Sequence, residues 1–360
     1  MIITATKNTK PVNICIHLFI VESRVFYLKR FIFLGISFVS FYQHIFKLSE
    51  NILFMDKIEH IKIKEGIKVS DLVSGMKGMG FGARNISDAS QIIKTMFSDK
   101  ECKVFLGVAG AMVPAGMKKI IIDLIGNTDV FVTTGANLTH DLIEALGHNH
   151  YKGDEKQDDA ELKKKGMDRI YNVLMPNNVY EKLEDFFSDN FGEFKECGKI
   201  KDFLLKIGEV LSKNDFGKDS ILRKCYESEI EIFCPGIADS GIGLMMWGRI
   251  VSGKGETSID VFSDMNDIID IAWTSEKKGI IYIGGGLPKN FIQQSLQFSK
   301  GADYGVQITT DSESGGGSSG ASLREGISWG KMNDEAKFID VRCDATIALP
   351  LIMGYLKDNL

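Results

Sequence analysis

The sequence lacks the cysteine and histidine spacings on which small metal-bound or disulfide-bonded proteins depend. Its six cysteines are scattered, no two of them form a C-x-x-C pair, and no histidine stands at ligand spacing beside them. This excludes a zinc cluster and a disulfide framework, and it indicates a reducing compartment, which we expect to be cytoplasmic. The sequence also has no Ser-His-Asp elbow and no P-loop, so it offers no signature of a serine hydrolase or a nucleoside triphosphatase.

A hydrophobic run long enough to cross a membrane is also missing from the unusual N-terminal region. Residues 1–54 contain eight phenylalanines, but their apolar run, residues 31–42, is too short to span a bilayer. A signal-peptide core or a short membrane-associating helix are other interpretations of this run. We expect Met55 to be the true start and residues 1–54 to be an N-terminal extension outside the folded domain. We expect no membrane partner.

Acidic residues outnumber basic ones outside the same region. The chain of 360 residues has a formal net charge of −5, and residues 1–55 carry six Lys and Arg against two Glu, so the remainder is distinctly acidic. An acidic body disfavours nucleic acid as a partner and suits a cationic substrate or a basic protein patch. With 44% hydrophobic and 25% charged residues, the composition excludes disorder, collagen and coiled coils.

From residue 55 onward, apolar runs typical of strands alternate with segments of helical spacing. The alternation is characteristic of βαβ units around a buried parallel sheet. It predicts an α/β fold for residues 55–360: a single large domain with a Rossmann-like, doubly wound, mostly parallel sheet flanked by helices. The charged stretch 152–165 is expected to form a solvated loop and the start of a helix. The expected strands are residues 104–108, 129–134, 230–237, 280–283 and 304–309, with helices at 117–125 and 291–298.

Ligands of open α/β sheets bind beyond the carboxyl ends of the strands, so the turns at those ends are informative. The three glycines at 284–286 would let the backbone approach a phosphate beside a helix N-terminus, although a flexible turn explains them equally well. Residues 133–141 carry several capping or ligand-binding side chains, and a helix cap needs only one of them. The small residues at 107–116 permit close approach of a planar or phosphate group, and helix–sheet packing explains them too.

A fourth segment combines a glycine- and serine-rich loop, residues 315–320, with Trp329 and Lys331. A lysine beside a tryptophan and between small residues can lose its hydration, which lowers its pKa and frees a neutral amine for Schiff-base chemistry. Taken alone, such a lysine is more often an ordinary surface residue. His148 and His150 lack a third ligand, so we expect a polar loop there and no metal site.

Six ordered segments carry a family resemblance: residues 130–147, 232–243, 280–292, 301–310, 325–332 and 344–352. They resemble deoxyhypusine synthase, and the resemblance runs from about Lys68 to the C-terminus. It implies a Rossmann-like homotetramer with active sites at subunit interfaces and NAD as the cofactor. NAD would oxidise the secondary amine of spermidine to an imine, and a lysine of the enzyme would attack that carbon and expel 1,3-diaminopropane. The butylamine would then pass to a lysine of the hypusine-carrying translation factor before NADH reduces the new imine. Residues 69–93 also resemble the family's amino-terminal region.

The resemblance also assigns site residues by position. Lys331 matches the nucleophile, and Trp329 and Glu325 match positions where an aromatic wall packs the methylenes and a carboxylate pairs with the terminal ammonium. Further substrate-binding positions are His140, Asn290, Gly316 and Ser318. The positions implied for NAD are Gly110, Ala111, Met112, Val113, Pro114, Thr134, Gly135, Ala136, Asp239, Gly285, Thr310, Asp311, Asp344 and Ala345.

The polyamine pocket departs from the eukaryotic pattern of that family. Thr139 and His140 stand where it has a Glu pair, Asn290 replaces a His, and Leu244 and Ser318 each replace an Asp. At least two acids that would hold ammonium ions are therefore missing, and each such charged hydrogen bond contributes roughly 1.5–3 kcal/mol. An archaeal-type deoxyhypusine synthase would need other acids. A related enzyme could transfer the aminobutyl group between small amines, as homospermidine synthase does, or use another donor, and a catalytically silent partner is a third hypothesis. The candidate replacement acids are Asp141, Asp239, Asp311 and Glu313.

Overall fold

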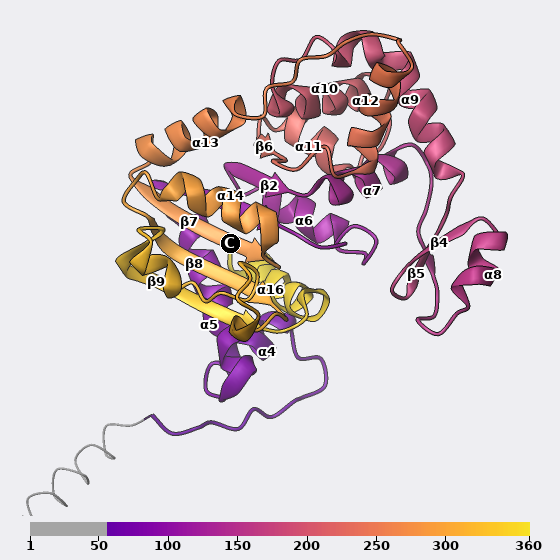
Figure 1. Ribbon diagram of the computed structural model, residues 1–360. Helices are drawn as coiled ribbons and strands as arrows, with labels where there is room; N and C mark the ends of the chain where they lie inside the picture. Colours follow the sequence, from indigo (N-terminus) through magenta and orange to yellow (C-terminus); the bar gives the residue numbers. More distant parts are fainter. Residues whose placement is uncertain (1–55) are drawn as a thin grey trace, which may run out of the picture. The chain divides into compact units, whose positions relative to one another are not determined.

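A six-stranded parallel sheet organises the chain. In the computed structural model, which describes residues 56–360, the strands lie side by side in the order β6-β2-β1-β7-β8-β9, and each neighbouring pair is parallel (Figure 1). The predicted α/β class with a mostly parallel sheet is confirmed. The strands are β1 (Cys102–Val108), β2 (Val130–Thr133), β6 (Glu231–Phe233), β7 (Lys277–Ile283), β8 (Ala302–Thr309) and β9 (Met332–Arg342).

The expected N-terminal extension, residues 1–54, and Met55 lie outside the described residues. Residues Glu59–Leu360 form one unit, and the structural statements that follow concern it. In the part of the chain that the structure describes, no helix is both long enough and apolar enough to cross a membrane.

The direction of strand addition reverses beside β1. The chain adds β2 and β6 on one side of β1, then returns to its other side and adds β7, β8 and β9. This is the doubly wound order of dinucleotide-binding folds, in which ligands bind at the point where the order reverses. That point lies between β1 and β7, which pair along their whole lengths from Cys102 with Lys277 to Val108 with Ile283.

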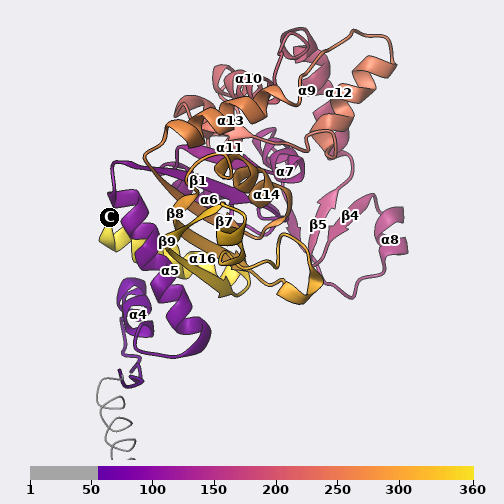
Figure 2. The same ribbon diagram turned by 60° about the vertical axis from the view of Figure 1, so that its left-hand side comes forward.

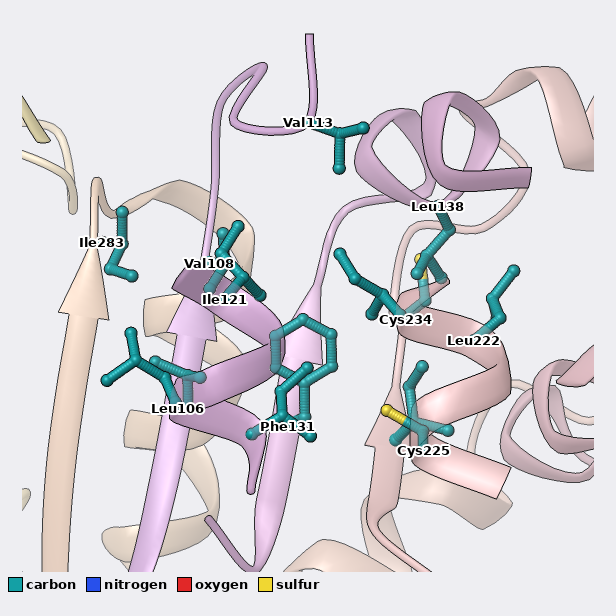
Figure 3. Close-up of a cluster of buried hydrophobic side chains, with 14 of the residues drawn as sticks. Leu106, Val108, Val113, Ile121, Phe131, Leu138, Leu222, Cys225, Cys234 and Ile283 are labelled. Carbon is teal, nitrogen blue, oxygen red and sulfur yellow. The ribbon is translucent and has the colours of Figure 1, made fainter. Parts of the chain in front are cut away.

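Alternating strand residues supply the two cores of the sheet. Leu106, Val108 and Ile283 face one cluster of buried side chains, part of which Figure 3 shows, and Phe105 and Tyr282 face the other. Each large apolar side chain buried in this way contributes about 1.5–3 kcal/mol. The near-continuous apolar strands are therefore stabilised from both sides, as expected for a parallel sheet.

Helices cover both faces of the sheet. α13 (Ser263–Thr274) and α14 (Gly286–Leu296) contribute to the cluster around Phe105, whereas α5 (Phe81–Ser98) and α16 (Ala345–Asn359) contribute to the other (Figure 2). The remaining helices are α4 (Val69–Met76), α6 (Lys118–Ile125), α7 (Gly135–Ala145), α8 (Asp159–Lys164), α9 (Val179–Phe194), α10 (Ile200–Lys213), α11 (Ile221–Glu227), α12 (Gly241–Val251) and α15 (Glu325–Ser328).

Several elements differ from the sequence-based expectation. The strand expected at 230–237 is only β6, because Pro235 cannot donate to a strand ladder and the chain turns there. The edge strand β9 was missed, since its exposed positions carry charges such as Asp334 and Lys337. The stretch 152–165 does contain the expected start of a helix, α8, but a small antiparallel sheet flanks it, with the strand order β3 (Tyr151–Lys152), β5 (Val173–Pro176) and β4 (Met167–Ile170).

Candidate active site

A pocket of about 210 Å³ lies between α14 and the crossover that runs from β8 back to β9. The structure brings the predicted nucleophile, Lys331, together with five of the six predicted substrate positions, all except His140. These five are Asn290, Gly316, Ser318, Glu325 and Trp329. The pocket is also lined by residues that the sequence did not single out for this site, among them Gln293, Gly317, Ala321, Ser322 and Gly326.

The backbone of Lys331 is fixed on both sides. Its N–H donates to the carbonyl oxygen of Gly326 at 2.8 Å, and its carbonyl accepts from the N–H of Ala302 at 3.1 Å. Gly330 has a φ of 68°, the left-handed conformation with which a glycine commonly follows a helix, here α15. Because Lys331 immediately precedes β9, its side chain leaves the chain at a defined position beside the sheet.

The Lys331 side chain lies against Trp329. Its Nζ is 5.1 Å from the centre of the Trp329 ring, which is within the range of a cation–π contact. Trp329 itself is 57% exposed, so the pocket opens to the surface of this chain at the tryptophan. Nζ makes no hydrogen bond or ion pair with the residues that the structure describes, which leaves its amine available to a ligand.

Two buried donors, Lys289 and Gln307, and the exposed Arg342 hold the glycine-rich loop, residues 312–321, that forms one wall of the pocket. Lys289 Nζ donates to the carbonyl oxygens of Ser318 at 2.7 Å and Ala321 at 2.6 Å. Gln307 Nε2 donates to Ser319 O and Ala321 O at 3.3 and 3.2 Å, and Arg342 Nη2 donates to Gly320 O at 2.9 Å. A loop of this composition has little structure of its own, so these donors set its conformation.

Lys289 is a functional candidate that the sequence analysis missed. Its side chain is only 1% exposed, and burial lowers its pKa from 10.5 to about 8. The carboxylates of Asp340 and Glu325 oppose this shift, whereas the positive charges of Arg342 and Lys331 add to it. The available signal was a lysine inside the buried helical pattern that follows the three glycines.

The pocket contains two carboxylates, Glu325 and Glu313, among its lining residues. Glu313 Oε1 lies 3.1 Å from Arg342 Nη2, which anchors it to β9. Of the four acids considered as replacements, Glu313 alone lines this pocket. Asp141 is fully buried and accepts hydrogen bonds from Ser220 Oγ and from two backbone N–H groups at the start of α11, so it is a structural cap.

The positions predicted for NAD lie along one edge of the sheet. Each of the six parallel strands is followed by at least one of them, and the two central turns, after β1 and β7, carry glycines with positive φ at Gly110 (77°) and Gly284 (75°). A Cβ on Gly285 would lie 2.3 Å from Ser319 Cα, so this turn packs directly on the glycine-rich loop. The edge of the sheet and the Lys331 pocket are therefore adjacent.

Asn137 braces the turn after β1. Its Oδ1 accepts from the N–H groups of Met112 at 3.1 Å and Val113 at 3.4 Å, and its Nδ2 donates to Thr133 Oγ1. These two amides are thus already bonded, whereas the N–H groups of Gly110 and Ala111 make no hydrogen bond to another described residue. The sequence analysis included Asn137 in the polar segment 133–141, but it did not predict that Asn137 holds the turn after β1.

Two predicted cofactor positions also have a structural role. Thr134 Oγ1 accepts from Asn137 N as the N-cap of α7, and Asp344 Oδ1 accepts from Thr346 N at 2.8 Å as the N-cap of α16. An N-cap of this kind stabilises its helix by about 1 kcal/mol. These side chains therefore have a reason to be polar with or without a cofactor.

His140, on α7, belongs to a separate chain of hydrogen bonds. Its Nδ1 is 2.9 Å from His150 Nε2, and His150 Nδ1 is 2.7 Å from Glu144 Oε1. Burial and the neighbouring His150 lower the pKa of His140 to about 4, and Glu144 opposes that shift. Residues 148–150 form neither helix nor strand, as expected for a loop, and the His150 side chain is only 5% exposed. Among residues 56–360, no group of three or more His, Cys, Asp or Glu side chains is arranged to hold a metal ion.

Comparison with known proteins identifies the family. The profile of the deoxyhypusine synthase family matches residues 71–356. The chain belongs to the deoxyhypusine synthase family. It is 39% identical to probable deoxyhypusine synthase 1 of Methanosarcina acetivorans over 84% of this chain and 95% of that protein. It is 40% identical to probable deoxyhypusine synthase 1 of Archaeoglobus fulgidus, with coverage of 83% and 97%, and 35% identical to a deoxyhypusine synthase-like protein of Chlorobaculum parvum, with coverage of 83% and 89%. The chain is accordingly a transferase.

The fold comparison agrees with this family. The crystal structure of a protein described as a putative deoxyhypusine synthase from Entamoeba histolytica superposes with a TM-score of 0.60, at 19% identity, over 83% of this chain and 96% of that chain. At this identity the likeness establishes the fold alone, and that fold is the doubly wound one described above.

Proposed function

We propose that this member of the deoxyhypusine synthase family transfers the 4-aminobutyl group of spermidine to a lysine of the hypusine-carrying translation factor, with NAD as cofactor. The observation that carries the proposal is the pocket in which Lys331, Trp329 and Glu325 meet. A lysine amine, an aromatic wall and a carboxylate are the groups that a covalently held alkylamine requires.

The carboxyl edge of the sheet suits NAD. The strand order reverses between β1 and β7, and Gly110 and Gly284 lie at that point with positive φ. The N–H groups of Gly110 and Ala111, which make no bond to another described residue, are the donors that we assign to the pyrophosphate. Asp239 and the residues after β8 and β9 would contact the remainder of the dinucleotide. When bound, NAD takes a hydride from the substrate carbon and later returns it.

Lys331 is the proposed nucleophile. Its neutral amine adds to the imine carbon of oxidised spermidine, and 1,3-diaminopropane leaves with the former secondary nitrogen and the proton it requires. The product is an imine between Lys331 and the aminobutyl group, which the amine of the acceptor lysine displaces by transimination. Trp329, 5.1 Å from Nζ, packs against the methylenes of this intermediate.

Glu325 and Glu313 are proposed to hold the ammonium groups of the donor. Both line the pocket, whereas Ser318 and Asn290, at the altered polyamine positions, offer only neutral contacts. Because Arg342 occupies Oε1 of Glu313, the carboxylate is already oriented before an amine arrives. A charge-assisted hydrogen bond to such a group contributes about 1.5–3 kcal/mol.

The neutral Ser318 and Asn290 also keep a second candidate function open. With fewer acids around the donor, a small amine such as putrescine is a possible acceptor in place of a protein lysine. The chemistry at Lys331 would be the same, and the product would be a polyamine.

A homo-oligomer is part of the proposal. Leu244, Trp247 and Val251 are exposed along one face of α12 at helical spacing, and Trp247 is 60% exposed. An apolar stripe of this kind is typical of a protein–protein contact. We propose that it joins copies of this chain into a homotetramer whose active sites lie at subunit interfaces. We also propose that the protein is cytoplasmic and that it starts at Met55, with residues 55–360 as one domain. The proposal includes neither a nucleic-acid partner nor a membrane partner.

The test is an assay with NAD and labelled spermidine, run once with the translation factor and once with putrescine. Label on the protein lysine together with release of diaminopropane supports the proposal, and label only in homospermidine supports the second candidate. Lys331→Ala should abolish either transfer while NAD binding persists, and Asp239→Ala should weaken NAD binding. Absence of transfer to both acceptors would contradict both functions, and loss of NAD binding in Lys331→Ala would make Lys331 structural.

A further inference from the structure

Four side chains form a continuous hydrogen-bonded relay beside the carboxyl edge of the sheet. Lys118 Nζ lies 2.5 Å from Glu144 Oε2, Glu144 Oε1 lies 2.7 Å from His150 Nδ1, and His150 Nε2 lies 2.9 Å from His140 Nδ1. The relay draws on α6, α7 and the segment that follows α7. Nothing in the proposed transfer mechanism uses Lys118, Glu144 or His150.

The positions of the protons in the relay can be worked out from the Lys118–Glu144 end. A carboxylate only accepts hydrogen bonds, so His150 must carry its proton on Nδ1. The Glu144 charge is already matched by Lys118, and a second positive charge on the buried His150 ring would be costly. In neutral His150 the other nitrogen, Nε2, is then an acceptor, and it must receive the proton of His140 Nδ1. This leaves His140 Nε2 with a lone pair.

The second ring nitrogen of His140, Nε2, is therefore a hydrogen-bond acceptor. His140 is half-buried, and its Nε2 makes no hydrogen bond with any residue that the structure describes. Its helix, α7, begins in the turn proposed for NAD, and the adjacent Thr139 Oγ1 accepts from the N–H of Ile242 at the start of α12. His140 thus lies on an element that the proposed site already uses.

We propose that Glu144 and His150 lock His140 in the Nδ1–H tautomer, so that Nε2 accepts a hydrogen bond from an N–H group of the cationic alkylamine substrate. This inference rests on the proposed function, because it gives His140 a defined role in binding the donor amine. Glu144 and His150 are positioning residues in this scheme. The neutral His140 thus accepts a hydrogen bond at a position where the eukaryotic pattern has a carboxylate. The carboxylate of Glu144 acts on it indirectly, through two hydrogen bonds.

Glu144→Gln should reverse the polarity of the relay. Lys118 continues to donate to the amide oxygen at position 144, which turns the amide NH₂ toward His150 Nδ1. His150 must then accept at Nδ1 and donate from Nε2, so His140 accepts at Nδ1 and carries its proton on Nε2. That N–H repels an ammonium.

The double variant Lys118→Met, Glu144→Gln is the matched rescue. Without the ammonium of Lys118, the amide at position 144 is free to turn its oxygen toward His150, and the original proton pattern becomes available again. A defect caused by misfolding or by loss of the carboxylate charge would not be repaired by a second substitution that removes a further charge.

The tautomer is measured directly by ¹⁵N NMR of histidine-labelled enzyme, with His140→Gln used to assign the signals. In the wild type His140 Nε2 should resonate as an unprotonated nitrogen and should shift when spermidine is added. In Glu144→Gln it should resonate as a protonated nitrogen, and in the double variant it should revert. A protonated Nε2 in the wild type would overturn the proposal.

Kinetics complete the test. Glu144→Gln should raise the KM for spermidine about 10- to 100-fold, as expected for one charge-assisted hydrogen bond, with NAD affinity unchanged and partial recovery in the double variant. An unchanged KM together with the reversed tautomer would overturn the substrate role of His140. If the wild type transfers nothing from spermidine, the proposed function fails, while the NMR result still decides the tautomer.

Discussion

Replacing Lys289 by Met removes the buried ammonium beneath the glycine-rich loop and keeps the length of the side chain. The ammonium donates to Ser318 O at 2.7 Å and to Ala321 O at 2.6 Å. Gln307 still donates to Ala321 O at 3.2 Å, so Ser318 O is the carbonyl that loses its donor. The loop is one wall of the Lys331 pocket, and its closed conformation should become less populated.

The size of the effect is a difference between two opposing contributions. Two hydrogen bonds from a charged donor contribute about 3–6 kcal/mol to the closed loop. Burial lowers the pKa of Lys289 from 10.5 to about 8, which corresponds to about 3 kcal/mol against the ammonium at neutral pH. When the loop opens, the ammonium regains its hydration, so the net stabilisation of the closed loop is about 0–3 kcal/mol. That range corresponds to at most about a 100-fold change in population.

We therefore expect Lys289→Met to lower kcat/KM for aminobutyl transfer by up to about 100-fold. The free energy of unfolding should fall by no more than the net stabilisation of the closed loop, about 0–3 kcal/mol, because Met conserves the buried volume. Steady-state kinetics and guanidinium unfolding measure the two quantities, and Lys300→Met, at an exposed position just after α14, is the control. A kcat/KM above the wild-type value, a decrease well beyond 100-fold, or a loss of folding would refute the reasoning.

The same group has a pH signature with a definite sign. Because the folded-state pKa of Lys289 is below its unfolded value, the burial penalty is fully present below about pH 8 and is relieved as the pH rises toward 10.5. The unfolded state binds more protons in that window, so Lys289 makes the free energy of unfolding rise there by about 3 kcal/mol relative to Lys289→Met. A difference between the two proteins that stays flat from pH 8 to 10.5 would show that the ammonium is not desolvated.

Three further changes test other parts of the structure. Burial raises the pKa of Asp264 from 3.8 to about 6, and the resulting cost to folding is absent below pH 3.8 and complete above pH 6. Asp264→Asn should therefore raise the free energy of unfolding by up to about 3 kcal/mol at pH 7 and leave it unchanged near pH 3.5, as measured by denaturant titration. Glu313→Gln should raise the KM for spermidine about tenfold with NAD affinity unchanged, and an unaltered KM would remove Glu313 from the donor site. Asp141→Ala should lower the free energy of unfolding by about 3–5 kcal/mol, because it leaves three buried donors unpaired, and a loss under 1 kcal/mol would contradict that role.

The sequence predicted the central strands because their burial on both faces leaves continuous apolar runs. β1 and the second half of β7 are nearly continuous hydrophobic segments. The expected strands 104–108 and 280–283 lie within them, although β7 begins three residues earlier, at Lys277. β9 was missed for the opposite reason. As an edge strand it pairs on one side only, and the charged residues at its exposed positions interrupt its apolar residues. The hydrophobic pattern therefore predicts the central strands of a doubly wound sheet more readily than its edge strands.

Part of the candidate site could likewise be predicted from the sequence, and part of it could not. The resemblance placed Lys331 and five substrate positions that the fold brings into one pocket. Lys289 and Gln307 were missed because their acceptors are backbone carbonyls of the glycine-rich loop, which have no sequence signature. The relay was missed for another reason. His148 and His150 suggested a metal or a loop, whereas the decisive contacts of His150 are with Glu144 and His140 on the preceding helix, and only the folded turn after α7 brings them together.

Position-by-position comparison left four candidates, Glu313 among them, for the missing acids of the pocket. Ser318, at the expected Asp position, suggested that the donor site had lost a charge. Glu313 lies five positions earlier in the same loop, yet it lines the same pocket, because Arg342 bonds both to its carboxylate and to the carbonyl of Gly320 and folds the loop back on itself. In a loop whose conformation is set by donors outside it, a charge can move along the sequence and still reach the same point in space. The substitution at Ser318 is therefore no argument against a cationic amine substrate, and Glu313→Gln is the variant that examines that binding.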